Sequence, residues 1–148
     1  MRFPTSRASA LSFIGAAAIL LFPPPGFAAG DRFEKHFPVT GRPVLTIQNA
    51  ANGRIEVKSS KNSEVVIAGK QASSKVSVET EQAANRIALT STILERNAAL
   101  ADIEANFEIT VPEETELEIH TTNMGTIYVE QVYGDMTLES VAGDIHLK

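Results

Sequence analysis

A glycine repeat with a period of nine residues constrains the fold of this chain more than any other feature of its sequence. Gly125, Gly134 and Gly143 are each followed by apolar residues two and four positions later, in the phrases GTIYV, GDMTL and GDIHL. A fourth copy, GRIEV, begins at Gly53. A fixed period of this kind is typical of repeat architectures. We therefore predict that these four glycines are structural and permit bends that a side chain would resist.

Nine residues are enough for one short strand and one turn, since a strand of five residues spans about 17 Å. Two such units would form one 18-residue coil of a flattened β-solenoid. Stacking of the coils would turn Ile127, Met136 and Ile145 inward. An antiparallel meander is the alternative, and it predicts tight two-residue turns, for which residues 130–133 (EQVY) are too long and too apolar.

Period-two alternation predicts strands along the rest of the chain. The clearest example is 103–111 (IEANFEITV), where five apolar residues alternate with polar ones, as in a strand with one buried face. Residues 94–100 (LERNAAL) have a helix-forming composition but could form only one or two helical turns, or a loop. The sequence thus predicts an all-β, single-domain fold. Further strands are predicted at 31–37, 44–47, 53–57, 64–68, 75–79 and 86–93.

The first 28 residues have the pattern of a secretory signal peptide. Two arginines precede the apolar run 8–21, three prolines end it, and a cut is expected after Ala28. An uncleaved membrane anchor is the alternative, but the run of 14 residues is shorter than the roughly 20 that a spanning helix needs. We predict a signal peptide at 1–28, a domain at 29–148 and an exported protein, periplasmic or extracellular.

Charge and cysteine content exclude several classes of protein. Residues 1–28 hold two of the 13 basic residues and none of the 18 acidic ones, so the predicted domain has a net charge of −7. This balance argues against nucleic acid and anionic membranes as partners. The chain has no cysteine, which excludes disulfides, thiolate metal sites and a lipid-modified cysteine anchor.

Three stretches resemble the bacterial putative-adhesin domains, a family of uncharacterised function. They are 44–57 (VLTIQNAANGRIEV), 107–112 (FEITVP) and 117–129 (LEIHTTNMGTIYV), the last of which leads into G-x-I-x-V units. The resemblance covers about 33–148 and implies an exported solenoid-like β-domain. Members of the family usually carry more repeat units. The expectation is therefore that the chain is truncated at its C-terminal end, or that a partner covers its last coil, because repeat arrays need capped ends.

No catalytic or cofactor site is predicted. Serines occur, but none lies in a G-x-S-x-G elbow, and the three histidines lack zinc-ligand spacing. Asp135 and Asp144 follow repeat glycines, and nonapeptide β-rolls bind calcium between turns through glycine-rich repeats that bear aspartate. Here each repeat has a single glycine, the aspartate is adjacent to it rather than two positions further on, and the first copy has Thr126, whereas calcium takes six or more oxygens. A solvated turn is the simpler interpretation. Tyr128, facing outward, and Tyr133, at the next corner, are the predicted surface contacts with a sugar or a partner.

These observations leave three hypotheses about function. The first is an exported, non-enzymatic module for adhesion, scaffolding or interaction with the envelope, whose ligand is an unidentified protein or glycan. The second is a small carbohydrate-active enzyme of the cell envelope. The third is a self-assembling β-module in which the strand edge near Lys148 pairs with another copy.

Overall fold

The computed structural model describes residues 32–148; the predicted signal peptide and its cleavage site lie outside this range. The described chain is built almost entirely of strands, and no helix in it is long and apolar enough to span a membrane. Its elements are β1 (Arg32–Pro38), β2 (Val44–Asn49), β3 (Gly53–Ser60), β4 (Glu64–Gln71), β5 (Val76–Ala83), β6 (Arg86–Ile93), the 3-10 helix η1 (Leu100–Ile103), β7 (Ala105–Pro112), β8 (Glu116–Glu130), β9 (Met136–Ala142) and β10 (Ile145–Leu147).

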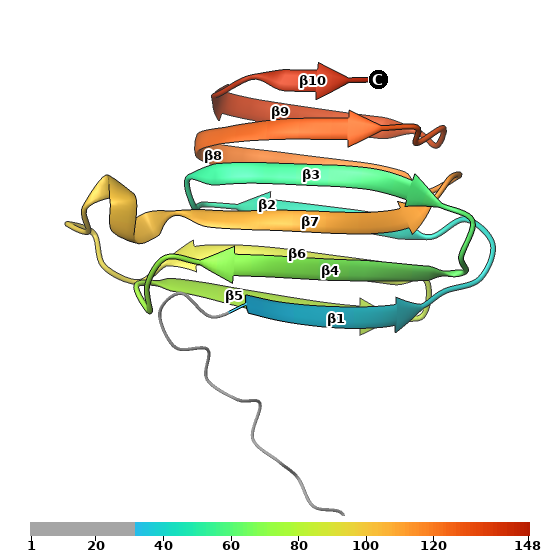
Figure 1. Cartoon of the computed structure of the whole chain (residues 1–148), viewed down its shortest axis with the longest axis horizontal. Helices are drawn as coiled ribbons and strands as arrows, with labels where there is room; N and C mark the ends of the chain where they lie inside the picture. Colours follow the sequence, from blue (N-terminus) through green and yellow to red (C-terminus); the bar gives the residue numbers. More distant parts are fainter. Residues whose placement is uncertain (1–31) are drawn as a thin grey trace, which may run out of the picture.

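Two sheets face each other across the core, and the long strand β8 belongs to both (Figure 1). The first sheet has the order β1-β4-β7-β3-β8-β10 and uses the second half of β8. The second sheet has the order β5-β6-β2-β8-β9 and uses the first half of β8. The register of β8 against β9 shifts between Thr121 and Met124, where β8 passes from one sheet to the other.

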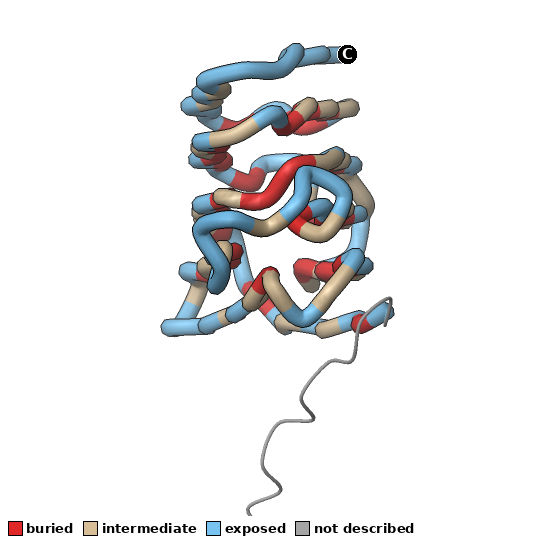
Figure 2. Tube along the Cα trace, turned by 90° about the vertical axis from the view of Figure 1, so that its left-hand side faces the viewer, coloured by how far each residue is buried: buried red, intermediate tan, exposed pale blue. Residues whose placement is uncertain are grey.

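The core follows from the alternation seen in the sequence. In β7, Ala105, Phe107, Ile109 and Val111 are all buried, whereas Glu108 between them is exposed. Residues of this kind from both sheets form one apolar cluster, and Figure 2 shows buried segments through the body of the molecule but none in the last layer before the C-terminus. Strands with one wet face need this pattern, because only one face of each sheet meets the other sheet.

The all-β prediction is confirmed, but the direction of the strands divides the molecule. Towards the C-terminal end the strands are parallel: β2, β8 and β9 in one sheet, and β7, β3, β8 and β10 in the other. Towards the N-terminal end the pairs β1–β4, β4–β7 and β5–β6 are antiparallel. Stacked coils of the predicted kind need parallel neighbours, so a solenoid over the whole domain is not confirmed.

Consecutive nine-residue units lie in opposite sheets. Ile127 pairs with Ile145, 18 residues later, whereas Met136 lies opposite Leu117 in the other sheet. Ile127 is fully buried, but Met136 and Ile145 keep 39% and 40% of their surface exposed. The predicted inward side is therefore shared in register by all three residues, but Met136 and Ile145 are only partly covered, since no strand of the described chain lies beyond β9 or β10.

The repeat glycines lie at two corners of the stack. Gly53 is paired with Gly125, and a Cβ on Gly143 would stand 2.2 Å from the carbonyl oxygen of Gly125. At the opposite corner, a Cβ on Gly134 would stand 2.1 Å from the carbonyl oxygen of Thr115. Gly53 and Gly143 also have positive φ, +122° and +154°, but Gly134 does not. At Gly134 it is therefore close backbone contact between layers that excludes a side chain.

A column of polar side chains crosses the second sheet at the corner where it meets the first. Ser91, Asn49, Thr121 and Ser140 occupy equivalent positions on β6, β2, β8 and β9. The Ser91 hydroxyl lies 2.5 Å from Asn49 Oδ1, and Thr121 donates to Ser140 over 3.1 Å. Asn49, Ser91 and Thr121 are buried, so these bonds satisfy groups that have lost water.

Candidate binding groove on the outer face of the first sheet

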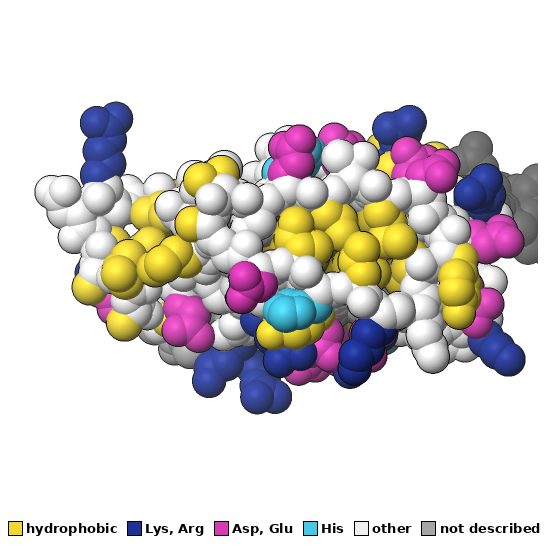
Figure 3. All heavy atoms as spheres, turned by 90° about the horizontal axis from the view of Figure 1, so that it is seen from above, with side chains coloured by type: hydrophobic (Ala, Val, Ile, Leu, Met, Phe, Trp, Pro, Cys, Tyr) yellow, Lys and Arg dark blue, Asp and Glu magenta, His cyan; other side chains and the backbone are white. Residues whose placement is uncertain are grey.

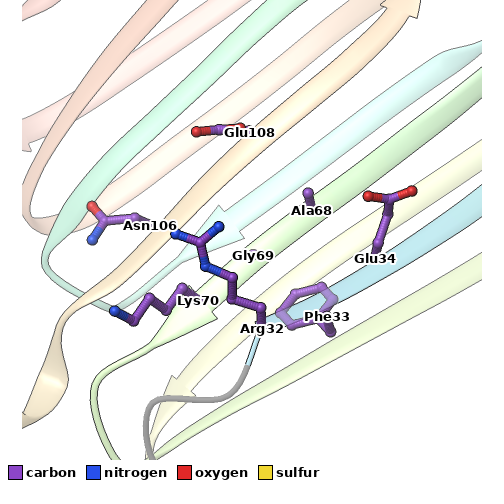
Figure 4. Close-up of a pocket in the computed structure, with 8 residues that line it drawn as sticks. All are labelled: Arg32, Phe33, Glu34, Ala68, Gly69, Lys70, Asn106 and Glu108. Atoms are coloured by element: carbon purple, nitrogen blue, oxygen red, sulfur yellow. The ribbon is translucent and has the colours of Figure 1, made fainter.

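The side chains of three neighbouring strands line an open groove on the outer face of the first sheet, with a volume of about 460 Å³ (Figure 4). The strands are β1, β4 and β7, and their register sets the outward residues in two rows. One row is Arg32, Lys70 and Asn106; the other is Glu34, Ala68 and Glu108. One end of the groove therefore carries two cations and the other carries two carboxylates.

Small residues keep the floor of the groove low. Ala68 and Gly69 form its centre on β4, and Ala68 lies between Glu34 and Glu108, so no long side chain rises between the two carboxylates. On the inner side the Phe33 ring packs under Gly69, where a Cβ would stand only 2.5 Å from the ring. Phe33 also meets Phe107 edge-to-face, with 6.4 Å between ring centroids. The glycine thus brings the core rings close beneath the exposed floor.

Most of the charged side chains in the groove form no ion pair within the described chain. Over residues 32–148, Arg32, Lys70 and Glu108 form no ion pair. Figure 4 shows the Arg32 side chain extending over β4 towards Asn106, with Lys70 and Glu34 on either side. An exposed charge without a protein partner stays hydrated, and a ligand of opposite charge can replace that water.

Glu34 is paired with a histidine at the rim of the groove. It bonds His36 Nε2 over 2.7 Å, and Glu64 lies 3.4 Å from the other ring nitrogen. The hydrogen bond to Glu34, followed by that to Glu64, raises the pKa of His36. Glu34 thus has a partner within the protein, whereas Glu108 at the same end of the groove forms no ion pair within residues 32–148.

A second depression, of about 210 Å³, lies beside the groove on the same face and shares Glu108 with it, but its other charged residues are paired internally. Glu56 binds Lys58 over 2.6 Å and Arg54 over 2.9 Å. The hydrogen bond from Lys58 lowers the pKa of Glu56 despite partial burial. Both cations are thus paired with Glu56, whereas Arg32 and Lys70 form no ion pair within residues 32–148, so the first groove is the better candidate for a ligand.

Tyr128 and Tyr133, the predicted surface contacts, lie apart from the groove. Tyr128 does face outward, but its ring stacks on His146 with 4.6 Å between centroids, and the Arg54 guanidinium lies 4.0 Å from the ring centre. These neighbours come from β10 and β3, on opposite sides of β8, so both ring faces are occupied. Tyr133 lies in the turn after β8 and is 72% exposed, which leaves its ring open to contact.

The predicted calcium positions take part in backbone pairing. Asp135 and Asp144 are exposed, and their carbonyl oxygens accept hydrogen bonds from Leu117 and Ile127 of the layer below. In residues 32–148, no three histidine, aspartate or glutamate side chains gather as metal ligands would. His120 instead lies between Glu118 at 3.2 Å and Glu139 at 2.9 Å, and these hydrogen bonds raise its pKa.

Comparison with solved structures finds proteins with a similar fold. The fold is similar to that of a putative cell adhesion protein from Clostridium sporogenes, at 11% sequence identity and a TM-score of 0.54. The match covers 80% of this chain and 58% of that one. The chain has the fold of the putative adhesins. The resemblance that the sequence predicted is therefore confirmed at the level of fold.

Two further putative adhesins are more distant. That from Bacteroides fragilis is 9% identical, with a TM-score of 0.41 over 78% of this chain and 61% of its own. That from Parabacteroides merdae is 6% identical, with a TM-score of 0.35 over 80% of this chain and 57% of its own. This chain spans less than two thirds of each of the three proteins. No protein-family model and no curated protein matches the sequence.

Sequence reasoning missed the groove entirely. Its residues come from three strands between 32 and 108, and only the antiparallel register of β1, β4 and β7 brings them together. The local signal was the pair of small residues Ala68-Gly69, which follows a β-branched run, Val65 to Ile67, in the same strand. A glycine inside a strand often marks a place where another group approaches closely.

Proposed function

We propose that this protein is an exported, non-enzymatic binding module of the adhesion type, which holds its ligand in the groove of β1, β4 and β7. The observation that carries the proposal is an open groove in which Arg32, Lys70 and Glu108 form no ion pair among residues 32–148. The name of the Clostridium protein supports the adhesion-like role, and the predicted signal peptide supports export. We propose further that the parallel strands around β8 are solenoid coils that carry this antiparallel binding face.

The charge pattern of the groove favours an amphoteric ligand. Arg32 and Glu34 are two positions apart on β1, which separates them by about 7 Å along the strand. A carboxylate of the ligand would lie between Arg32 and Lys70, and an ammonium would lie between Glu34 and Glu108. Short peptide segments with both charges fit this spacing, whether they belong to a protein or to a peptide-bearing glycan of the envelope.

The binding test uses protein secreted from cells that express the full chain. It would be titrated with isolated bacterial envelopes and with a set of short peptides that carry both charges, one charge, or neither. We expect binding to envelopes and a preference for the doubly charged peptides. Arg32→Gln with Lys70→Gln should weaken binding at least tenfold, since two charge-assisted contacts are lost.

Lys61→Gln is the matched control, because Lys61 is an exposed lysine of the β3–β4 turn outside the groove. It should bind as the parent protein does. Envelope binding that is equal in the parent, groove and control proteins would contradict the groove as the site. Absence of binding to any envelope or peptide would contradict the binding module itself.

Export and the lack of catalysis need their own measurements. The secreted protein should have a mass that corresponds to a chain beginning at Ala29. Incubation with envelope glycans, with and without calcium, should release no cleavage product. A cytoplasmic, uncleaved chain would contradict export, and a released glycan fragment would favour the carbohydrate-active enzyme instead.

A further inference from the structure

The groove on the first sheet has a direction, and that direction runs along β4. The side chains of β1 and β7 stand on its two sides, and these strands are about 10 Å apart, twice the distance between neighbouring strands. This width admits one extended chain. Alternate residues of β4 are buried, so the other four form the floor: Glu64, Val66, Ala68 and Lys70.

The sign of the charge changes along this floor but not across it. Arg32 of β1 lies opposite Lys70, so the first position carries two cations. Two residues along the strand, Ala68 lies between the carboxylates of Glu34 and Glu108. Figure 3 shows basic and acidic side chains projecting from the first sheet along the lower side of the view. A chain that lies along β4 therefore meets cations and then carboxylates, with the two rows about 7 Å apart.

The next position along the floor is apolar. Val66 is half-buried and lies between His36 on β1 and Thr110 on β7. The His36 ring is bonded by Glu34 and Glu64, so a charge on this ring is already paired. This position therefore offers a ligand an apolar contact and no free charge.

We propose that the groove binds an extended peptide segment with an acidic residue, a basic residue two positions away, and an apolar residue two positions beyond that. In an extended chain, alternate side chains point to the same side and lie about 7 Å apart, which matches the rows. The acidic side chain would bind Arg32 and Lys70. The basic one would lie above Ala68 between the two carboxylates, and the apolar one would contact Val66.

The residues between these three positions would point to solvent, so the groove would accept any side chain there. This inference rests on the proposed binding function, and it adds the conformation and the residue pattern of the ligand. A helical ligand would not match, because residues three or four positions apart share a helix face and residues two apart do not. The spacing of the two charges therefore distinguishes an extended ligand from a helical one.

Capped peptides with one acidic and one basic residue in a serine–threonine host test the spacing. The two charges are placed one, two, three or four positions apart, in both orders, because the rows contact side chains rather than the ligand backbone. The capped ends carry no charge. Each peptide would be titrated calorimetrically into the secreted full-chain protein, up to about 1 mM. We expect charges two positions apart to bind at least tenfold more tightly than any other spacing.

Equal affinities at all spacings would overturn the extended pattern while leaving the binding module intact. Preference for charges three or four positions apart would overturn it in favour of a helical ligand. If no peptide binds although isolated envelopes still bind through the groove, the peptide pattern alone is overturned. If neither binds, the proposed function is overturned with it.

A leucine added to the best peptide tests the third position. Two positions beyond the basic residue it should strengthen binding at least threefold, because it would cover the exposed part of Val66. One position beyond, it would point to solvent and should change nothing, which makes it the matched control. An equal gain at both positions would overturn the apolar contact.

Ala68→Leu tests the floor without changing any charge, since the larger side chain would rise between the two carboxylates. It should weaken binding of the best peptide at least tenfold. Thr126→Leu is the control, because Thr126 faces outward on β8 and lies outside the groove. Equal binding by both variants would overturn the site on β4. Circular dichroism would establish that both remain folded.

Exchange of the cations tests the assignment of the rows. Arg32→Glu with Lys70→Glu makes both rows acidic, so the variant should prefer a peptide with two basic residues, two positions apart, over the peptide with one charge of each sign. The parent protein should show the opposite preference. The same preference in both proteins would overturn the assignment of acidic and basic side chains to these rows.

Discussion

The two ends of the molecule are built differently, although the same alternating strands form both. At the N-terminal end the edge strands β1 and β5 approach each other, and Lys35 Nζ on β1 bonds Thr80 Oγ1 on β5 over 2.7 Å. The Gln82 side chain adds a bond of 2.8 Å to the Pro38 carbonyl. At the C-terminal end of the described chain β9 and β10 each pair only with β8, and they expose apolar side chains. Antiparallel strands with polar side chains close a stack, whereas parallel strands continue it.

The largest expected difference concerns one apolar column that leads to the open end. Ile55, Ile127 and Ile145 are paired across β3, β8 and β10, and only Ile145 is exposed. Ile127→Ala should lower the free energy of unfolding by about 2–5 kcal/mol, because it leaves a cavity between two layers. Ile145→Ala should cost less than about 1 kcal/mol.

Urea unfolding of both variants would measure this difference. The two changes remove the same atoms, so the difference between the two losses in free energy of unfolding comes from the strand that covers Ile127 and is lacking above Ile145. Equal losses for Ile127→Ala and Ile145→Ala would show that the last layer is as well packed as the one below it, which would contradict the exposed end.

A smaller effect is expected at the corner glycines. Gly134→Val should cost about 1–3 kcal/mol, since the new Cβ would meet the Thr115 carbonyl and force the two layers apart. Gly41→Ala is the matched control near the closed end: its φ is +61°, but nothing lies within 4 Å of the new Cβ. Its cost should be limited to the backbone strain of about 1 kcal/mol. A melting temperature of Gly134→Val equal to that of the parent would contradict the close contact.

A serine-to-alanine change at each end of the polar column compares the stability of the two ends of the molecule. Ser91 is buried towards the closed end, bonds Asn49 and accepts from Ala50 over 3.0 Å. Ser140 is half-buried at the open end and donates to the Gly125 carbonyl over 3.2 Å. Ser91→Ala should cost about 1–3 kcal/mol, because buried groups lose their partners, and Ser140→Ala about 0.5–1.5 kcal/mol, because water can replace the hydroxyl. Thermal unfolding of the two variants would show whether this order holds.

The smallest expected effect is a dependence on pH supplied by one histidine near each end. Hydrogen bonds to glutamates raise the pKa of His36 on β1 and of His120 on β8. The folded state therefore binds the proton more tightly than the unfolded state. The stabilisation is complete below the ordinary histidine pKa of about 6.5, and it is lost as pH rises through the higher folded value.

Melting temperatures between about pH 6 and pH 8.5 should fall as the pH rises, and His120→Gln should flatten part of this slope. His36→Gln should flatten it less, because His36 is more exposed and solvent screens its pairs. A slope that is unchanged in the variant with both substitutions would exclude these histidines as its source.

Local patterns predicted the strands better than their partners. The alternation in 103–111 identified β7 and its buried residues, and the glycine period identified the units that became β9 and β10. Periodicity does not state which strands are neighbours, so the antiparallel placement of β1 beside β4 and the groove that results were not predictable. Gly125 was predicted to mark a bend between two strands; β8 is instead one strand of 15 residues, which passes from one sheet to the other just before Gly125. Pairing with β3 and β10 over the following residues keeps that strand extended.

The register of the last coil also bears on how such proteins change length during evolution. Because Ile145 lies over Ile127, a duplication of 18 residues would return each later strand to the same sheet with its apolar side chains still inward. A duplication of nine residues would transfer every later strand to the opposite sheet. Gains and losses of sequence in this part of the fold are therefore expected in whole coils, which would lengthen the body while leaving the groove unchanged.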